Sequence, residues 1–184
     1  MAGDASLRLF CALRLPADAL DALETWQEEY LREAATRPHT RLVERRNLHI
    51  TLVFLGQRLE GDVSGVVDAL REAAARTSAP RFGIRGYRET RAVGMLLLDD
   101  ADGAGAALAA NLGADLERRR LFGPERRPWL PHVTVLRFRE RPGLRPPLPA
   151  LGEVSPSDAA VYSSTLRSEG AQYEVLNTVS LGGR

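Results

Sequence analysis

Two short segments of the chain repeat one arrangement of a histidine and a threonine. Residues 49–52 read His-Ile-Thr-Leu and residues 132–135 read His-Val-Thr-Val, so an aliphatic residue separates the two polar side chains in both. The chain has three histidines, and the third, His39, follows Pro38 in a predicted loop. A single His-x-Thr segment is usually structural, but two copies that use two of three histidines indicate a shared task.

The chemistry that these segments offer is proton transfer at a phosphate group. Side chains two positions apart on a strand share a face at a spacing of about 7 Å, so His49 would lie beside Thr51 and His132 beside Thr134. Imidazole titrates near pH ~6.5, so two imidazoles can act together as general acid and general base. Two hydroxyls add neutral donors for phosphate oxygens. The set predicts attack on a phosphodiester without a metal ion. The residues expected on the opposite, core-facing side of the first strand are Leu48, Ile50, Leu52 and Phe54.

The composition excludes several other kinds of chemistry. All 25 basic residues are arginine, which excludes Schiff-base catalysis and a phosphate-loop lysine. A bound anion must therefore meet guanidinium, hydroxyl, imidazole or backbone N–H groups. The single cysteine, Cys11, allows no internal disulfide, and no carboxylate–histidine spacing resembles a zinc site. We expect neither a metal nor a cofactor.

No segment of the sequence has the pattern of a membrane span or a secretion signal. Apolar runs such as residues 95–98 are strand-sized and far shorter than the ~20 residues of a span. Residues 1–4 lack the basic and then apolar layout of a signal peptide. With a net charge of +1, the chain is typical of a cytoplasmic protein that does not bind membranes. We expect a monomer with a single domain over residues 1–184, of which residues 1–6 are flexible.

Hydrophobic periodicity predicts an α+β fold with mostly antiparallel sheet. The strands are predicted by period-two alternation or by short apolar runs, over residues 7–15, 48–55 (closed by Gly56), 81–87, 92–98 and 133–138. The helices are predicted by apolar residues at helical spacing, over residues 16–30, 63–74 and around residues 108–116. Prolines between residues 142 and 149 mark a loop. Residues 159–166 and 173–181 predict a closing hairpin, joined through residues 168–170.

Four stretches of the sequence together resemble one known group of enzymes. They are residues 8–16 (Arg-Leu-Phe-Cys-Ala-Leu, then Leu-Pro), residues 47–56 around the first histidine, residues 127–134 around the second, and residues 162–173 in the tail. They are similar to the two-histidine phosphoesterase superfamily and, within it, to the RNA 2′,3′-cyclic phosphodiesterase branch, also called the 2′-5′ RNA ligase family. The resemblance runs from about Leu7 to Leu181. Val135 and Trp129 replace the more usual leucine and phenylalanine and keep the hydrophobic character.

The resemblance implies a fold, a reaction and a set of roles. The fold is bilobal, with two pseudo-symmetric lobes of mostly antiparallel sheet, helices on the outside and a central cleft. The reaction is metal-independent hydrolysis of RNA 2′,3′-cyclic phosphate ends, on tRNA fragments or nucleotides, to 2′-phosphomonoesters. By position, His49 is the proton donor and His132 the proton acceptor, while Thr51 and Thr134 bind phosphate. Arg137 corresponds to an arginine that contacts phosphate.

Three of the candidate substrate contacts have competing interpretations. Strict alternation places Arg137 on the face opposite His132, so it reaches the site only if the strand bulges or ends before it. Phe10 and Trp129 are candidates to stack on a base and are equally suited to packing.

Two charge-rich segments are also ambiguous. Eight arginines between residues 118 and 141, against Glu125 and Glu140, would either guide RNA to the second histidine or form a solvated helix end and loop. Asp99, Asp100 and Asp102 fit a helix cap better than a cation site.

Two other functions use the same residues. A binding module would hold RNA or a nucleotide without turnover, although arginine would serve that purpose as well as histidine. Ligation of RNA through a 2′-5′ bond is the reverse of the same reaction. Turnover of an oligonucleotide that ends in a 2′,3′-cyclic phosphate separates an enzyme from a binding module.

Overall fold

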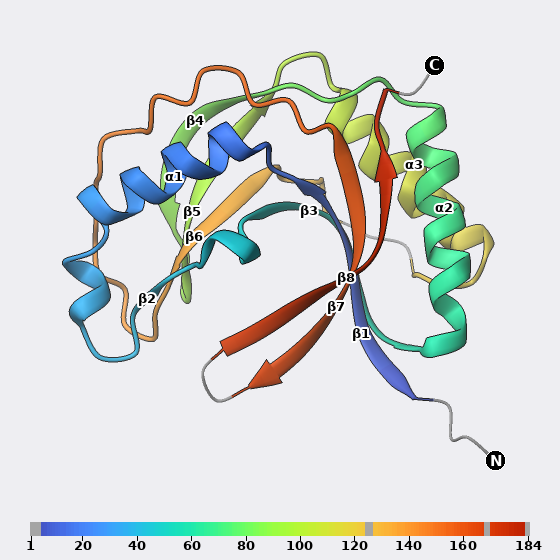
Figure 1. Cartoon of the computed structure of the whole chain (residues 1–184), viewed down its shortest axis with the longest axis horizontal. Helices are drawn as coiled ribbons and strands as arrows, with labels where there is room; N and C mark the ends of the chain where they lie inside the picture. Colours follow the sequence, from blue (N-terminus) through green and yellow to red (C-terminus); the bar gives the residue numbers. More distant parts are fainter. Residues whose placement is uncertain (1–4, 124–126, 168–169, 183–184) are drawn as a thin grey trace.

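The computed structural model describes residues 5–123, 127–167 and 170–182, which form a curled antiparallel sheet with three α-helices (Figure 1). The strands are β1 (Ser6–Arg14), β2 (Arg41–Leu42), β3 (His49–Leu59), β4 (Phe82–Glu89), β5 (Val93–Asp100), β6 (His132–Arg137), β7 (Asp158–Arg167) and β8 (Gly170–Ser180). The helices are α1 (Ala17–Tyr30), α2 (Val63–Ala75) and α3 (Ala104–Arg118). Short 3-10 turns are η1 (Ala34–Thr36), η2 (Arg45–Asn47) and η3 (Glu60–Asp62).

The predicted α+β class and the predicted elements are confirmed, with one exception. The strand of the first histidine does not end at Gly56 but continues to Leu59. Gly56 has a φ of 72° and lies where the pairing of β3 with β1 shifts by one residue, so it forms a bulge within the strand. Residues 1–4 of the segment expected to be flexible and residues 168–169 of the hairpin turn lie outside the described residues. Ser6 already belongs to β1.

The sheet has a two-fold pattern about its centre. The strand order is β4-β5-β6-β3-β1-β7-β8, with β2 beside β6. The unit β1–α1–β3 and the unit β5–α3–β6 each run from a strand through a helix to a histidine-bearing strand. These units are the two pseudo-symmetric halves, and they meet where β3 pairs with β6. The two histidine segments are therefore on neighbouring strands.

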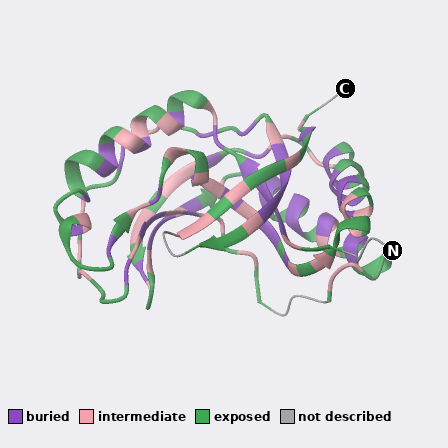
Figure 2. Ribbon diagram, turned by 60° about the horizontal axis from the view of Figure 1, so that its bottom comes forward, coloured by how far each residue is buried: buried purple, intermediate pink, exposed green. Residues whose placement is uncertain are grey.

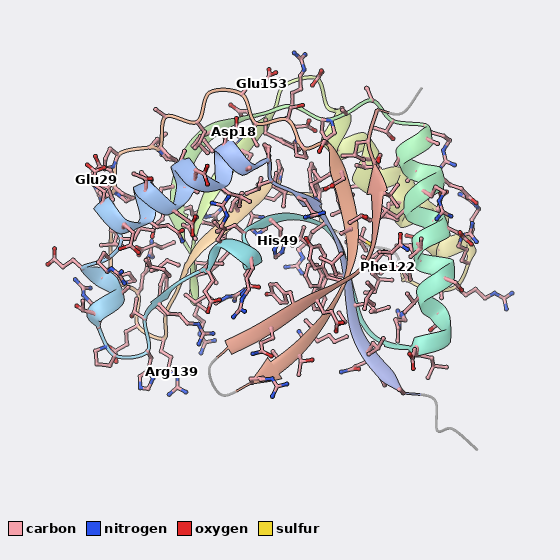
Figure 3. All side chains as sticks on the ribbon, in the orientation of Figure 1. Asp18, Glu29, His49, Phe122, Arg139 and Glu153 are labelled. Carbon is pink, nitrogen blue, oxygen red and sulfur yellow. The ribbon has the colours of Figure 1, made fainter. Side chains whose placement is uncertain are left out.

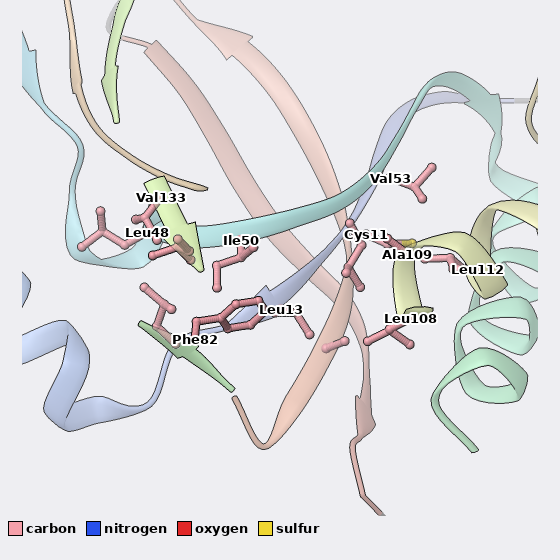
Figure 4. Close-up of a cluster of buried hydrophobic side chains, with 14 of the residues drawn as sticks. Cys11, Leu13, Leu48, Ile50, Val53, Phe82, Leu108, Ala109, Leu112 and Val133 are labelled. Carbon is pink, nitrogen blue, oxygen red and sulfur yellow. The ribbon is translucent and has the colours of Figure 1, made fainter. Parts of the chain in front are cut away.

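The main core lies between one face of the sheet and the three helices. Ile50 of β3 and Val133 of β6 are both buried in it, together with Leu108 and Leu112 of α3 (Figure 4). The helices direct their buried residues toward the sheet and their exposed residues outward (Figure 2). Cys11 is fully buried in this core, and burial raises the pKa of its thiol to about 12, as expected for an unreactive cysteine. In the described part of the chain, no helix is long and apolar enough to be a transmembrane helix.

A buried amide on α1 connects that helix to the strand of the second histidine. Gln27 is 3% exposed, and its Nε2 donates to the carbonyl oxygens of Val43 at 3.0 Å and Val135 at 2.8 Å. Polar groups in a core are costly unless they are paired, so this amide and these carbonyls depend on one another. Gln27 therefore fixes the backbone of β6 just after the second His-x-Thr segment.

Replacing Gln27 by leucine should lower the free energy of unfolding by about 1–3 kcal/mol, because a buried carbonyl loses its donor. The matched control is Glu28→Leu at the next, exposed position of α1, where Glu28 forms an ion pair with exposed Arg32. The control should change the free energy by less than about 1 kcal/mol. Denaturant titration measures both variants. Equal losses at the two positions would contradict the role assigned to Gln27.

Candidate active site

One strand pairing brings the two histidine segments together. Ile50 of β3 pairs antiparallel with Val133 of β6, and these two residues are 0% and 2% exposed. Their side chains enter the core. Because successive side chains of a strand point to opposite faces, the residues on either side of this pair point away from the core.

The four polar residues of the repeat consequently share the concave face of the sheet. Continued by one position each way, the register sets His49 opposite Thr134 and Thr51 opposite His132. In Figure 3, His49 faces the space between β3 and the β7–β8 hairpin. Each histidine thus has one threonine on its own strand and another across from it, and all four side chains are half-buried.

Both imidazoles are oriented by the same backbone contact. Nδ1 of His49 lies 2.8 Å from the carbonyl oxygen of Asn47, and Nδ1 of His132 lies 2.8 Å from that of Leu130. Because a carbonyl oxygen only accepts, Nδ1 is the protonated nitrogen of both rings. Nε2 is then the nitrogen that exchanges a proton. In His49, Nε2 lies 3.1 Å from Oγ1 of Thr51.

Aromatic side chains surround His49. Its ring centroid lies 5.1 Å from that of Phe10, 5.5 Å from that of Tyr173 and 6.0 Å from that of Tyr162. Phe10, Tyr162 and two small residues form a second buried cluster on the concave face. These rings hold the imidazole in place and remove water from it.

This environment disfavours a charge on His49. Burial, together with the smaller effects of positive charge at His132 and Arg137, lowers the pKa of His49 from its usual 6.5 to about 4. The hydrogen bond to the backbone of Asn47 acts in the opposite direction. His49 alone is therefore neutral near pH 7. Its interaction with His132 and Arg137 also shows that these groups share one electrostatic environment.

A bulge in β6 reverses the side-chain alternation after the second threonine. Along β5, Gly94 pairs with Leu136 and Met95 pairs with Thr134, so Val135 is an extra residue. Val135 and Leu136 are consecutive and both 0% exposed. The residue that follows is accordingly turned to the concave face.

That residue is Arg137. The sequence required a bulge in β6 for Arg137 to reach the site, and the strand has this bulge. Nη2 of Arg137 donates to the hydroxyl of Tyr173 at 3.4 Å. Since Tyr173 also meets the edge of the His49 ring, Arg137 lies beside the first histidine. The geometry suits a guanidinium that contacts the same anion as the imidazoles.

Phe54 lies on the other face from the one predicted, whereas Phe10 packs, which is one of its two interpretations. Phe54, predicted in the core, is 47% exposed, because β3 has an extra residue at Leu52 and both Leu52 and Val53 are buried. The core prediction for Phe54 is wrong for this reason. Phe10 is only 2% exposed and stacks on Tyr162 at 4.8 Å, so it packs beside the site and has no open face for a base.

Trp129 is also a packing residue. Its ring lies 6.3 Å from that of Phe82 and packs against the main core. Its Nε1 donates to the backbone oxygen of Thr51 at 2.9 Å. Trp129 therefore supports β3 from the core side, below the threonine.

Three of the described arginines between residues 118 and 141 form ion pairs with acidic side chains. Arg118 and Arg119 lie at the end of α3, where they pair with Asp115 and Glu72. Arg141 pairs with buried Glu89. Arg126 lies outside the described residues.

The remaining polar candidates also have structural positions. Asp100 accepts from the backbone N–H groups of Gly105 at 3.0 Å and Ala106 at 2.7 Å, so the predicted helix cap is confirmed. His39 is exposed in the loop before β2. Within the described residues, no cluster of three or more His, Cys, Asp or Glu side chains could hold a metal ion.

The site contains residues that sequence reasoning did not assign to it. Tyr162 and Tyr173 reach His49 from the closing hairpin, and Asn47 supplies the carbonyl that orients it. Alternation along the predicted hairpin strands could indicate which faces carry these tyrosines. It could not indicate that the hairpin packs beside β1.

The chain is similar to known phosphoesterases. A family described as LigT-like phosphoesterase matches residues 13–88, which include the first histidine segment. The RNA 2′,3′-cyclic phosphodiesterase of Thermus thermophilus is 32% identical over 96% of this chain and 91% of that protein. The protein of the same name from Escherichia coli is 28% identical, over 95% and 96%. A crystal structure from Thermus thermophilus has a TM-score of 0.80 at 28% identity, covering 96% and 99% of the two chains. Escherichia coli LigT complexed with 3′-AMP has a TM-score of 0.75 at 22% identity, covering 97% and 100%, and has the same fold.

His49 should titrate with a pKa of about 4 when its ring signals are followed by NMR against pH. Arg137→Gln should raise this pKa, because it removes a positive charge that disfavours the imidazolium. Adding inorganic phosphate should raise it too, since an anion favours the charged ring. Arg32→Gln, just after α1, is the control and should leave the pKa of His49 unchanged. A pKa near ~6.5 in the unmodified protein would show that the aromatic cluster does not exclude water from the ring.

Proposed function

The chain belongs to the LigT-like phosphoesterase family, together with proteins named RNA 2′,3′-cyclic phosphodiesterase, and from this membership we propose that it opens RNA 2′,3′-cyclic phosphates. The reaction is hydrolysis to a 2′-phosphomonoester, without a metal ion. One observation carries the proposal. Two imidazoles and two hydroxyls, from segments 83 positions apart, meet on one face through the Ile50–Val133 pairing.

The cyclic phosphate binds between the two His-x-Thr segments in this proposal. The hydroxyls of Thr51 and Thr134 donate to the non-bridging oxygens. Arg137 adds a charge-assisted contact and offsets the charge that develops on phosphorus. When the phosphate oxygen replaces Nε2 of His49 as the partner of Thr51, that nitrogen becomes available to the leaving group.

The two imidazoles then divide the proton transfers. Nε2 of His132 takes a proton from the attacking water as its oxygen bonds to phosphorus. Nε2 of His49 gives a proton to the 3′ oxygen as the bond from phosphorus to that oxygen breaks. The product keeps the phosphate on the 2′ oxygen, and the two histidines end with their protonation states exchanged.

The donor role requires a charged His49, which burial alone disfavours. The substrate supplies the compensating interaction, because a phosphate anion beside the ring favours the imidazolium. The alternative assignment, with His132 as donor, uses the same geometry in reverse. The assignment of His49 as donor comes from its position in the family's motif.

The other two functions are not favoured. The similar proteins named above are phosphodiesterases, which supports turnover over a binding module and hydrolysis over ligation. The proposed enzyme acts on RNA ends in the cytoplasm. We propose that it is a monomer, since one chain supplies both histidine segments.

Hydrolysis should continue in excess EDTA, because the hydroxyls and Arg137 offset phosphate charge without a cation. The assay is conversion of a 2′,3′-cyclic nucleotide to the 2′-monophosphate, followed by chromatography. A metal-dependent phosphodiesterase assayed in parallel verifies that the chelator acts. Activity that disappears in EDTA and returns with a divalent ion would refute the metal-free reaction.

Replacing either histidine by alanine should lower turnover by about 10²–10⁴-fold, the usual contribution of general acid or base catalysis. A substrate with a good leaving group needs little protonation as it departs. Such a substrate should therefore restore the turnover of His49→Ala much more than that of His132→Ala. Thr51→Ala should respond equally to both substrates and serves as the control. Equal restoration of the two histidine variants, or the reverse order, would show that the roles are wrongly assigned.

A further inference from the structure

A pair of residues on the concave face is outside the acid–base machinery. Phe54 is 47% exposed, and the guanidinium carbon of Arg8 lies 4.9 Å from its ring centroid. Arg8 has no carboxylate partner among the residues that the structure describes. We call these two residues the Arg8–Phe54 patch. The patch therefore combines a half-exposed aromatic ring with a guanidinium that lies over it.

The patch is continuous with the histidine site. Phe10 lies between them, with its ring centroid 5.1 Å from that of His49 and 6.2 Å from that of Phe54. Phe10 and Phe54 are also direct partners across β1 and β3. A chain that leaves the site along β1 therefore meets Phe54 and Arg8 next.

A groove with both polar and apolar walls, the latter from Leu7 and Leu166, extends from the patch. β1 pairs with β7 no further than Leu9 with Ser163, although β1 continues to Ser6 and β7 to Arg167. The separating strands leave a groove of about 280 Å³. Its lining includes hydroxyl or amide groups from Ser6, Gln57, Ser163, Ser164 and Thr165.

Among the residues that the structure describes, Arg8 is the only charged one that lines this groove. The chemistry of the patch and the groove therefore combines a flat apolar ring, one cation and several neutral hydrogen-bonding groups. Single-stranded nucleic acid presents the complementary groups: bases that stack, an anionic phosphate and sugar hydroxyls. A lipid surface or an acidic protein would call for several cations, which the groove lacks.

We infer that the Arg8–Phe54 patch and its groove bind the RNA nucleotides that precede the cyclic phosphate end. The inference rests on the proposed function, because it takes the histidine site to hold that end. The base of the nucleotide before the terminal one stacks on Phe54. The phosphate on the 5′ side of that nucleotide contacts Arg8. The enzyme is then selective for oligonucleotides over mononucleotides.

The test compares two substrates with the same reacting end. One is adenosine 2′,3′-cyclic phosphate, and the other is a five-nucleotide oligoadenylate that ends in the same group. The unmodified enzyme should have the higher kcat/KM for the oligonucleotide. Hydrolysis of neither substrate would refute the proposed function, whereas equal hydrolysis of both would refute only the inference.

Variants then locate the selectivity. Phe54→Ala and Phe54→Leu should lower the ratio of the two kcat/KM values by about 5- to 150-fold, the range measured for loss of one base–aromatic stack. Arg8→Gln should lower the ratio as well. It should also reduce the salt dependence of the oligonucleotide reaction by about 0.7 in the slope of log kcat/KM against log salt concentration. The slope is a readout that a merely structural effect would not move.

Two substitutions on α1 and just after it are matched controls. Tyr30→Ala removes another exposed aromatic ring and Arg32→Gln another exposed arginine, and both should leave the ratio unchanged. If the Phe54 variants lower kcat/KM equally for both substrates, the ring acts only through Phe10 on His49, and the inference is wrong. If Arg8→Gln leaves the salt slope unchanged, Arg8 meets no phosphate and the inference is wrong as well.

Discussion

The antiparallel pairing of Ile50 with Val133 is the contact on which the site depends. It buries one aliphatic residue from each histidine segment, and burial of such a side chain contributes about 1.5–3 kcal/mol. A slip of one residue would bring a histidine into the core and expose an aliphatic side chain. The hydrophobic core therefore excludes a one-residue slip and keeps both imidazoles and both hydroxyls on the same side of the sheet. Stability and the geometry of the site have the same cause.

Bulges in β6 and β3 place further side chains on the concave face, beside the groups that the pairing brings together. A regular β6 would turn Arg137 into the core, and the extra residue Val135 turns it to the concave face. The carbonyl of Val135 accepts from Gln27 and from the backbone N–H of Val43, so the bulge is held on both sides. The extra residue in β3 does the same for Phe54. Each bulge breaks the two-residue period once, and each moves a long side chain to the concave face of the sheet.

Much of this was accessible from the sequence, because periodicity depends on local geometry. The boundaries of β1 and α1 follow from alternation and helical spacing, and the repeat itself indicated that His49 and His132 act together. The positions of bulges and the docking of the last hairpin could not be predicted in this way. Whether Leu52 or Val135 is an extra residue depends on the pairing with β1 or β5, which no local pattern contains. The exposure of Phe54 could not be predicted for that reason. The contacts of the tyrosines with His49 depend in turn on how the last hairpin docks against β1.

The repeat makes the two histidines equivalent in sequence, and folding makes them different. Three aromatic rings lie against His49, and their exclusion of water disfavours its charged form. The same exclusion strengthens its attraction to an anion, because Coulomb energies increase as the local dielectric constant falls. Half-buried His49 is therefore neutral by itself, and an adjacent phosphate would favour its charged form. By linkage, binding of the phosphate and uptake of the proton assist each other. The burial of His49 thus ties its charged form to the presence of the phosphate with which it would react.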